Sequence, residues 1–181
     1  MRATGIVRRM DELGRVVIPK EIRKTLRMKE GDPLELFTER DELILKKYSP
    51  LNNMDGLAET VCKCLSAATG HAVLVTDGDA VVAASGTGTR DAAGKAVSLS
   101  LEKVLAEKNV LVCNAADGAE PIEIAKGDDF GFLNEVFLPI LSEGDARGIL
   151  IVADKRKESG VSSEDIRLAG LAADVLSSHT V

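Results

Sequence analysis

The stretch DELGRVVIPKEIRKTLR, residues 11–27, decides how the first part of this chain folds. Residues 11–14 are a turn signal that ends in glycine, and residues 15–18 are a short apolar run typical of a strand. Pro19 suits the first position of a helix, because its missing N–H would have no partner there. The same stretch carries five cations, which are Arg15, Lys20, Arg23, Lys24 and Arg27. It predicts a small strand–turn–helix unit with a strongly basic surface.

Basic residues concentrate near the start of a chain that is acidic as a whole, with a net charge of −6. Residues 1–48 contain 12 Lys and Arg against 9 Asp and Glu, whereas the remaining residues contain 11 against 20. A cationic surface on an acidic chain usually has a polyanion as its partner. The charge distribution therefore predicts two modules with different partners.

The first module is predicted to contain four strands and one helix. The strands are expected at residues 5–9, 15–18, 34–38 and 43–47, and the helix at residues 20–27. A unit of about 48 residues buries too little apolar surface to be stable alone, and this one has no disulfide or metal ligands to compensate. We expect it to complete its core with a second copy in a closed dimer.

Three cations of the predicted helix lie on one stripe. Lys20, Lys24 and Arg27 share this stripe, while Ile22 and Leu26 lie on the stripe that faces the core. A solvated helix face whose last cations complement the helix dipole would explain Lys24 and Arg27 without any ligand.

That alternative does not explain the three arginines that lie outside the helix, Arg8, Arg9 and Arg15. They belong to the same small module, so a dimer would concentrate twice the charge on one particle. Phe37 and Tyr48 are the only aromatic residues of the module, which disfavours base stacking on single strands or RNA. Duplex DNA is the predicted partner.

Residues 4–48, TGIVRRMDELGRVVIPKEIRKTLRMKEGDPLELFTERDELILKKY, resemble the AbrB-type swapped-hairpin DNA-binding domain of bacterial transition-state regulators. The resemblance implies a swapped-hairpin β-barrel, an intertwined dimer in which hairpins of two chains interdigitate. It places the DNA-contacting arginines at Arg8, Arg15 and Arg23, with Lys24 where many members have arginine. Lysine cannot make a bidentate contact, so we expect Lys24 to bind phosphate only. Together with Arg9, these residues form the predicted DNA site.

A second domain is expected at residues 54–181, after a linker at residues 49–53. Its pattern predicts a mostly antiparallel sheet and an α+β fold. The expected helices are residues 54–68, 98–108 and 163–178, and the expected strands are residues 72–76, 80–85, 110–113, 135–141 and 148–154. Residues 114–134 are polar and irregular, which is typical of a lid or a binding loop.

Residues 135–155, EVFLPILSEGDARGILIVADK, resemble the strand–turn–strand signature of a GAF domain, an α/β sandwich. GAF domains often bind small molecules, so the resemblance implies an unidentified effector between the sheet and residues 114–134. Asp77, Ser85 and Asn134 are the candidate lining residues. A ligand-free domain used for oligomerisation is the alternative. An AbrB-type domain followed by a GAF-like one is similar to transcription regulators of spore development.

The cysteines and histidines do not indicate catalysis. Cys62 and Cys64 lie two apart on a predicted helix and point to nearly opposite faces, so they cannot form a redox pair. Cys113 has no partner histidine in the sequence, and His71 and His179 are isolated. A GAF-type methionine sulfoxide reductase, the enzyme alternative, would need a base and a nucleophile together. We expect no enzyme, no metal and no cofactor.

The sequence thus predicts a sequence-selective DNA-binding regulator, dimeric through residues 1–48 and tetrameric through the helices at residues 54–68 and 163–178. No apolar run approaches the roughly 18 residues of a membrane span, and the cysteine content fits a reduced compartment, so we expect a cytoplasmic, nucleoid-associated protein. An antitoxin is the rival, because the same module occurs in toxin–antitoxin pairs. Those proteins usually clamp the toxin with a short disordered tail, whereas here a folded domain is expected.

Overall fold

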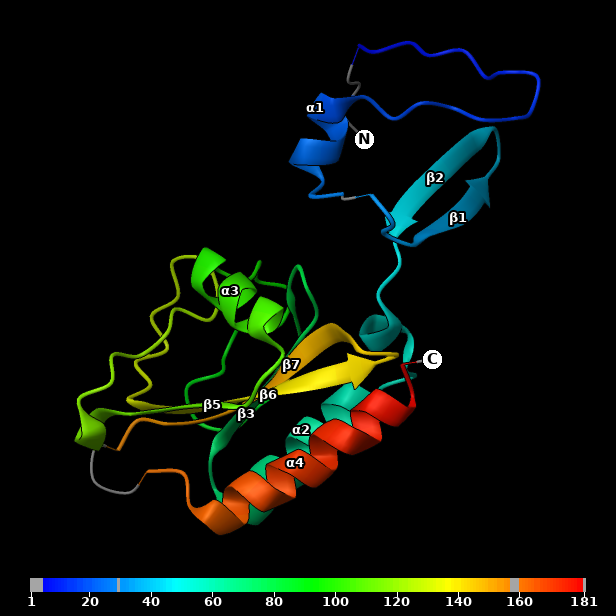
Figure 1. Cartoon of the computed structure of the whole chain (residues 1–181). Coiled ribbons are helices and arrows are strands. Elements are labelled where there is room, and N and C mark those ends of the chain that lie inside the picture. The colour runs from blue at the N-terminus through cyan, green and yellow to red at the C-terminus, as the bar shows by residue number, and fades with distance from the viewer. Residues whose placement is uncertain (1–4, 29, 157–159, 181) are drawn as a thin grey trace. The chain divides into compact units, whose positions relative to one another are not determined.

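The computed structural model describes residues 5–28, 30–156 and 160–180 and divides into two compact units, Met1–Tyr48 and Ser49–Val181 (Figure 1). The first unit contains a short helix and one antiparallel hairpin. The helix is α1 (Lys20–Thr25), and the hairpin strands are β1 (Leu34–Glu39) and β2 (Glu42–Lys47). Pro19 is the residue before the helix rather than its first residue. Arg27 has a φ of 52°, a left-handed conformation that ends the helix earlier than the sequence predicts.

The prediction of strands at residues 5–9 and 15–18 is wrong for the single chain, in which both segments are irregular. A strand needs a second backbone to complete its hydrogen bonds, and the described part of this unit offers one only between β1 and β2. The predicted turn between the two segments is present. It is closed by hydrogen bonds of 3.0 Å from the Asp11 N–H to the Arg15 carbonyl and from the Gly14 N–H to the Asp11 carbonyl.

The second unit is a five-stranded antiparallel sheet with helices on both faces. Its strand order is β4-β3-β7-β6-β5. The strands are β3 (Ala72–Thr76), β4 (Val81–Ser85), β5 (Leu111–Asn114), β6 (Asn134–Ser142) and β7 (Asp145–Asp154). The helices are α2 (Leu57–Thr69), α3 (Leu99–Glu107) and α4 (Ser163–Ser178), with short 3-10 turns η1 (Pro50–Asn53) and η2 (Ala115–Asp117).

The sheet separates two hydrophobic cores. One core packs α2 and α4 against one face, with Cys62, Leu150 and Leu176 fully buried. The other core packs α3 and the segment at residues 118–133 against the opposite face, around Phe137 and Ile151. Figure 1 shows α2 and α4 together on one side of the sheet and α3 on the other. This arrangement is the α/β sandwich that the sequence predicts.

Local signals in the sequence set the ends of these elements. Gly70, with a φ of 74°, ends α2, and the Ser162 side chain accepts a hydrogen bond from the Asp165 N–H at the start of α4. The expected linker at residues 49–53 lies within the second unit, and Leu51 is buried in the same core as α2 and α4. Among the described residues, no helix is long and apolar enough to cross a membrane.

Candidate nucleic-acid interface

The first unit presents its cations to solvent. Arg8, Arg9, Arg15, Arg23 and Lys24 are all exposed. In the described part of the chain, Arg9, Arg23 and Lys24 make no ion pair, and the Arg8 guanidinium donates only to the Val7 carbonyl, at 3.1 Å. Cations without carboxylate partners are available to a polyanion. The structure therefore leaves four of the five predicted DNA contacts unneutralised.

Arg15 differs from the other four cations because a carboxylate holds it. Its Nε donates to Asp11 Oδ2 at 2.7 Å, and its side chain is still 72% exposed. The sequence analysis missed Asp11 as a site residue. A signal for it was present, since an aspartate at the first position of a turn commonly binds backbone N–H groups a few residues on.

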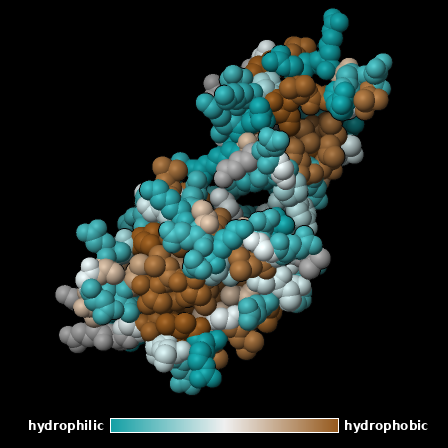
Figure 2. Space-filling view, viewed as in Figure 1, coloured by the Kyte–Doolittle hydropathy of each residue, from teal (hydrophilic) through white to brown (hydrophobic). Residues whose placement is uncertain are grey.

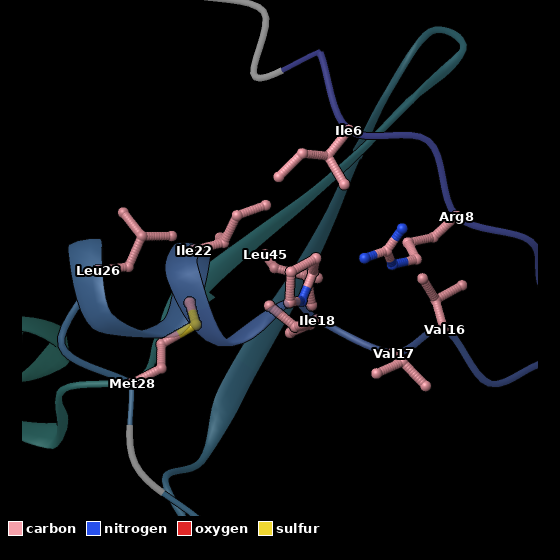
Figure 3. Close-up of a pocket in the computed structure, with 10 residues that line it drawn as sticks. Ile6, Arg8, Val16, Val17, Ile18, Ile22, Leu26, Met28 and Leu45 are labelled. Atoms are coloured by element: carbon pink, nitrogen blue, oxygen red, sulfur yellow. The ribbon is translucent and has the colours of Figure 1, made fainter.

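An apolar groove of about 350 Å³ lies beside these cations in the first unit (Figure 3). Its walls come from the segments on both sides of the turn, from α1 and from β2. The lining residues are Ile6, Arg8, Val16, Val17, Ile18, Pro19, Ile22, Leu26, Met28 and Leu45. Figure 2 shows apolar surface gathered on one face of this unit. Apolar surface of this kind on a small unit usually marks an interaction site.

The three candidate effector residues lie apart in the second unit. Ser85 on β4 and Asn134 on β6 are separated by β3 and β7, which is about 14 Å at the usual strand spacing. Asp77 follows the opposite end of β3 and binds the backbone N–H groups of Asp79 and Ala80 at 2.7 and 2.8 Å. The Asn134 side chain accepts from the Ala115 N–H and donates to the Arg156 carbonyl. The structure does not bring these three residues together.

The face of the sheet that α3 and residues 118–133 cover holds a buried acid that the sequence analysis also missed. Glu135 on β6 is 2% exposed, and its Oε2 accepts the Ile122 N–H at 2.7 Å. Burial raises the pKa of the Glu135 carboxyl to about 7. The strand β6 is buried on both faces of the sheet over most of its length, and its sequence gave no signal that this carboxylate would face a core.

The cysteines have no feature of a catalytic thiol. Burial raises the pKa of the Cys62 thiol to about 12 and also raises the pKa of the Cys113 thiol. Cys64 is exposed. No group of three or more potential metal ligands occurs among the described residues.

Two known protein families match parts of this chain. Residues 53–180 match the family described as "Stage V sporulation protein T C-terminal, transcription factor", and residues 7–52 match "Antidote-toxin recognition MazE, bacterial antitoxin". Stage V sporulation protein T of Bacillus subtilis (strain 168) is 41% identical to this chain over 161 residues, which is 88% of this chain and 89% of that protein. The chain belongs to the stage V sporulation protein T family of transcription regulators.

Two further comparisons concern the two parts of the chain separately. The transition state regulatory protein AbrB of Bacillus subtilis (strain 168) is 46% identical over 78 residues, which is 43% of this chain and 81% of AbrB. The GAF domain of an Acinetobacter phosphoenolpyruvate-protein phosphotransferase is similar in fold, with a TM-score of 0.57 and 13% identity over 75% of this chain and 84% of that structure. At that identity the likeness shows the fold alone.

These comparisons confirm the predicted combination of an AbrB-type domain and a GAF-like domain in an α+β protein. The stage V sporulation protein T family consists of transcription factors, so the chain is a transcription regulator and not an enzyme. Its AbrB-type domain makes DNA its partner.

Proposed function

We propose that the chain binds duplex DNA sequence-selectively, as a homodimer formed through residues 1–48. The residues that contact the DNA are Arg8, Arg9, Arg15, Arg23 and Lys24. The observation that carries this proposal is the absence of a core in the first unit. None of its described residues, 5–28 and 30–48, is buried. Val7, Val17 and Leu13 are 84%, 73% and 70% exposed. A second copy supplies the missing core by filling the groove that contains Ile18, Ile22 and Leu45.

The charge of the first unit supports DNA as the partner of this dimer. The four cations without ion pairs flank the groove-forming segments, so closing the dimer brings two sets of them onto one particle. Lys24 serves phosphate only, because its ammonium is a point charge, whereas the arginines offer a planar fork to phosphates or bases.

The DNA assay uses the duplex that the full-length chain selects most strongly from a random pool, with a scrambled duplex as reference. The logarithm of the affinity should fall with the logarithm of the salt concentration, with a slope on the order of −5 or steeper for six or more phosphate contacts. A slope near zero, or equal affinity for both duplexes, refutes the proposal.

We further propose that the GAF-like domain joins two dimers into a tetramer. The outward stripe of α4 exposes Leu168, Leu171 and Val175, which are 42%, 65% and 38% exposed, and α4 lies against α2. Apolar helix faces of this kind suit contact with another subunit. Native mass spectrometry measures the subunit number directly. A dimer at micromolar concentration contradicts the tetramer, and a bound metabolite mass would reveal an effector of this domain.

The antitoxin alternative does not fit the described residues that follow the first unit. An antitoxin of this type uses a disordered tail after the swapped-hairpin module, whereas here the residues after the first unit form a sheet with helices on both faces. The match of residues 7–52 to an antitoxin family is accounted for by the module that the two classes share. As a regulator of genes, the chain would work in the cytoplasm at the nucleoid. Co-purification with a small toxic protein would favour the antitoxin instead.

A further inference from the structure

Asp11 divides its carboxylate between the backbone of the turn and the side chain of Arg15. Its Oδ1 accepts the N–H groups of Leu13 and Arg15, at 3.0 and 2.8 Å. Within the described part of the chain, its Oδ2 accepts only from Arg15 Nε, at 2.7 Å. One oxygen therefore holds the turn, and the other holds the guanidinium.

The contact through Nε leaves the far end of the guanidinium unused. Arginine has five N–H donors in a planar fork, and four of them are on Nη1 and Nη2. Among the described residues, no group binds Nη1 or Nη2 of Arg15, and the side chain is 72% exposed. Asp11 therefore holds the guanidinium at Nε and leaves the N–H groups of the two terminal nitrogens available to a ligand.

A carboxylate at this place works against DNA binding through charge alone. Phosphates repel it, and it partly neutralises the neighbouring arginine. The N–H groups of Arg15, the backbone first and the guanidinium second, lower the pKa of the Asp11 carboxyl, so it is ionised at neutral pH. The charge of Asp11 therefore does not serve attraction to DNA, and its contacts are with the backbone of the turn and with the Arg15 guanidinium.

We propose that Asp11 is a positioning residue for base recognition, which holds the Arg15 guanidinium so that Nη1 and Nη2 read the O6 and N7 atoms of one guanine in the major groove. This inference rests on the proposed DNA binding through Arg15. Bidentate contact with guanine needs both terminal nitrogens in one plane at a fixed angle. An arginine already ordered by Asp11 loses less side-chain freedom on binding.

Asp11→Asn separates the two tasks of the carboxylate. The amide oxygen still accepts the backbone N–H groups of Leu13 and Arg15, but the amide nitrogen cannot accept from Nε. Glu12→Gln is the matched control, because it removes one negative charge from the adjacent, exposed residue. Both variants change the net charge equally, so a difference between them reports the position of Arg15.

The experiment measures the ratio of affinities for the selected and scrambled duplexes, using full-length protein. Asp11→Asn should lower this ratio about fivefold, Glu12→Gln should leave it unchanged, and Arg15→Ala should lower it at least tenfold. The salt slope of Asp11→Asn should equal that of the wild type, because the phosphate contacts are kept. In the Arg15→Ala background, Asp11→Asn should have no further effect.

A spectroscopic signal distinguishes positioning from a loss of structure. The Arg15 Nε–H should give a slowly exchanging ¹H–¹⁵N signal in the wild type and in Glu12→Gln, and lose that protection in Asp11→Asn while the backbone signals of the turn persist. An unchanged ratio in Asp11→Asn, with Arg15→Ala defective, overturns the positioning role alone. An unchanged ratio in both variants overturns the use of Arg15 in the proposed function, and the positioning role with it.

Discussion

Glu135→Gln should remove a large part of the pH dependence of the stability of the GAF-like domain. Glu135 lies on β6, on the face of the sheet that α3 and residues 118–133 cover, and it is buried among apolar side chains. Burial raises the pKa of its carboxyl from 4.5 to about 7. The Ile122 N–H opposes this shift and the charge of Asp128 adds to it. Because the folded pKa lies above the unfolded one, the folded state holds the proton more tightly. The stabilisation is complete below pH 4.5 and is lost as the pH rises through 7.

The size of the effect follows from the two pKa values. A rise from 4.5 to about 7 corresponds to roughly 3 kcal/mol of unfolding free energy when Glu135 is fully ionised in the folded state. Between pH 5 and pH 8 the wild type should lose most of this free energy through this residue. With a urea m-value of about 2 kcal/mol per molar, the unfolding midpoint should fall by about 1 M more than in Glu135→Gln.

The assay is urea unfolding of the full-length chain at several pH values, followed by circular dichroism at 222 nm. Gln can still accept the Ile122 N–H, and its amide adds a cost that does not vary with pH, so the slopes decide the result. Glu120→Gln, a change at an exposed acid of the same segment, is the control and should follow the wild type. Parallel curves for the wild type and Glu135→Gln would refute the reasoning.

Three further predictions concern stability and assembly. Gly148→Ala should destabilise the second unit by about 4 kcal/mol or more, because a Cβ would clash with the Thr76 carbonyl and the Leu51 side chain. Gly144 has open space around it and a φ of 82°, so Gly144→Ala should destabilise the unit by about 1 kcal/mol. The two variants are compared by their midpoints of urea unfolding. Ser162→Ala should lower the free energy of unfolding by about 1 kcal/mol, because it removes the acceptor of the Asp165 N–H at the start of α4. Ser100→Ala, within α3, should lower it by less than half of that in the same measurement. Leu45→Asp should prevent dimerisation of the first unit by placing a charge in the groove, while Leu43→Asp, outside the groove lining, should retain the dimer in sedimentation velocity.

The sequence determined the local features of both units. Gly70 lies at the end of α2 and Ser162 at the start of α4, and the Asp77 side chain accepts backbone N–H groups in the turn between β3 and β4. These features depend on backbone conformations and on hydrogen bonds within a few residues, so they can be predicted from residues that are adjacent in the sequence. The stretch at residues 11–27 also indicated a basic module, because its cations share one short segment, and the small size of that module predicted the second copy that we propose.

Only the tertiary structure decided which distant residues meet. His71, isolated in the sequence, bonds Asp154 at 2.9 Å and Asp165 at 3.3 Å, because the strand order places the end of β7 beside the start of β3 and the start of α4. Glu135 is buried because the segment at residues 118–133 covers its face of the sheet. Long-range contacts of this kind arise from packing, which no short sequence pattern encodes.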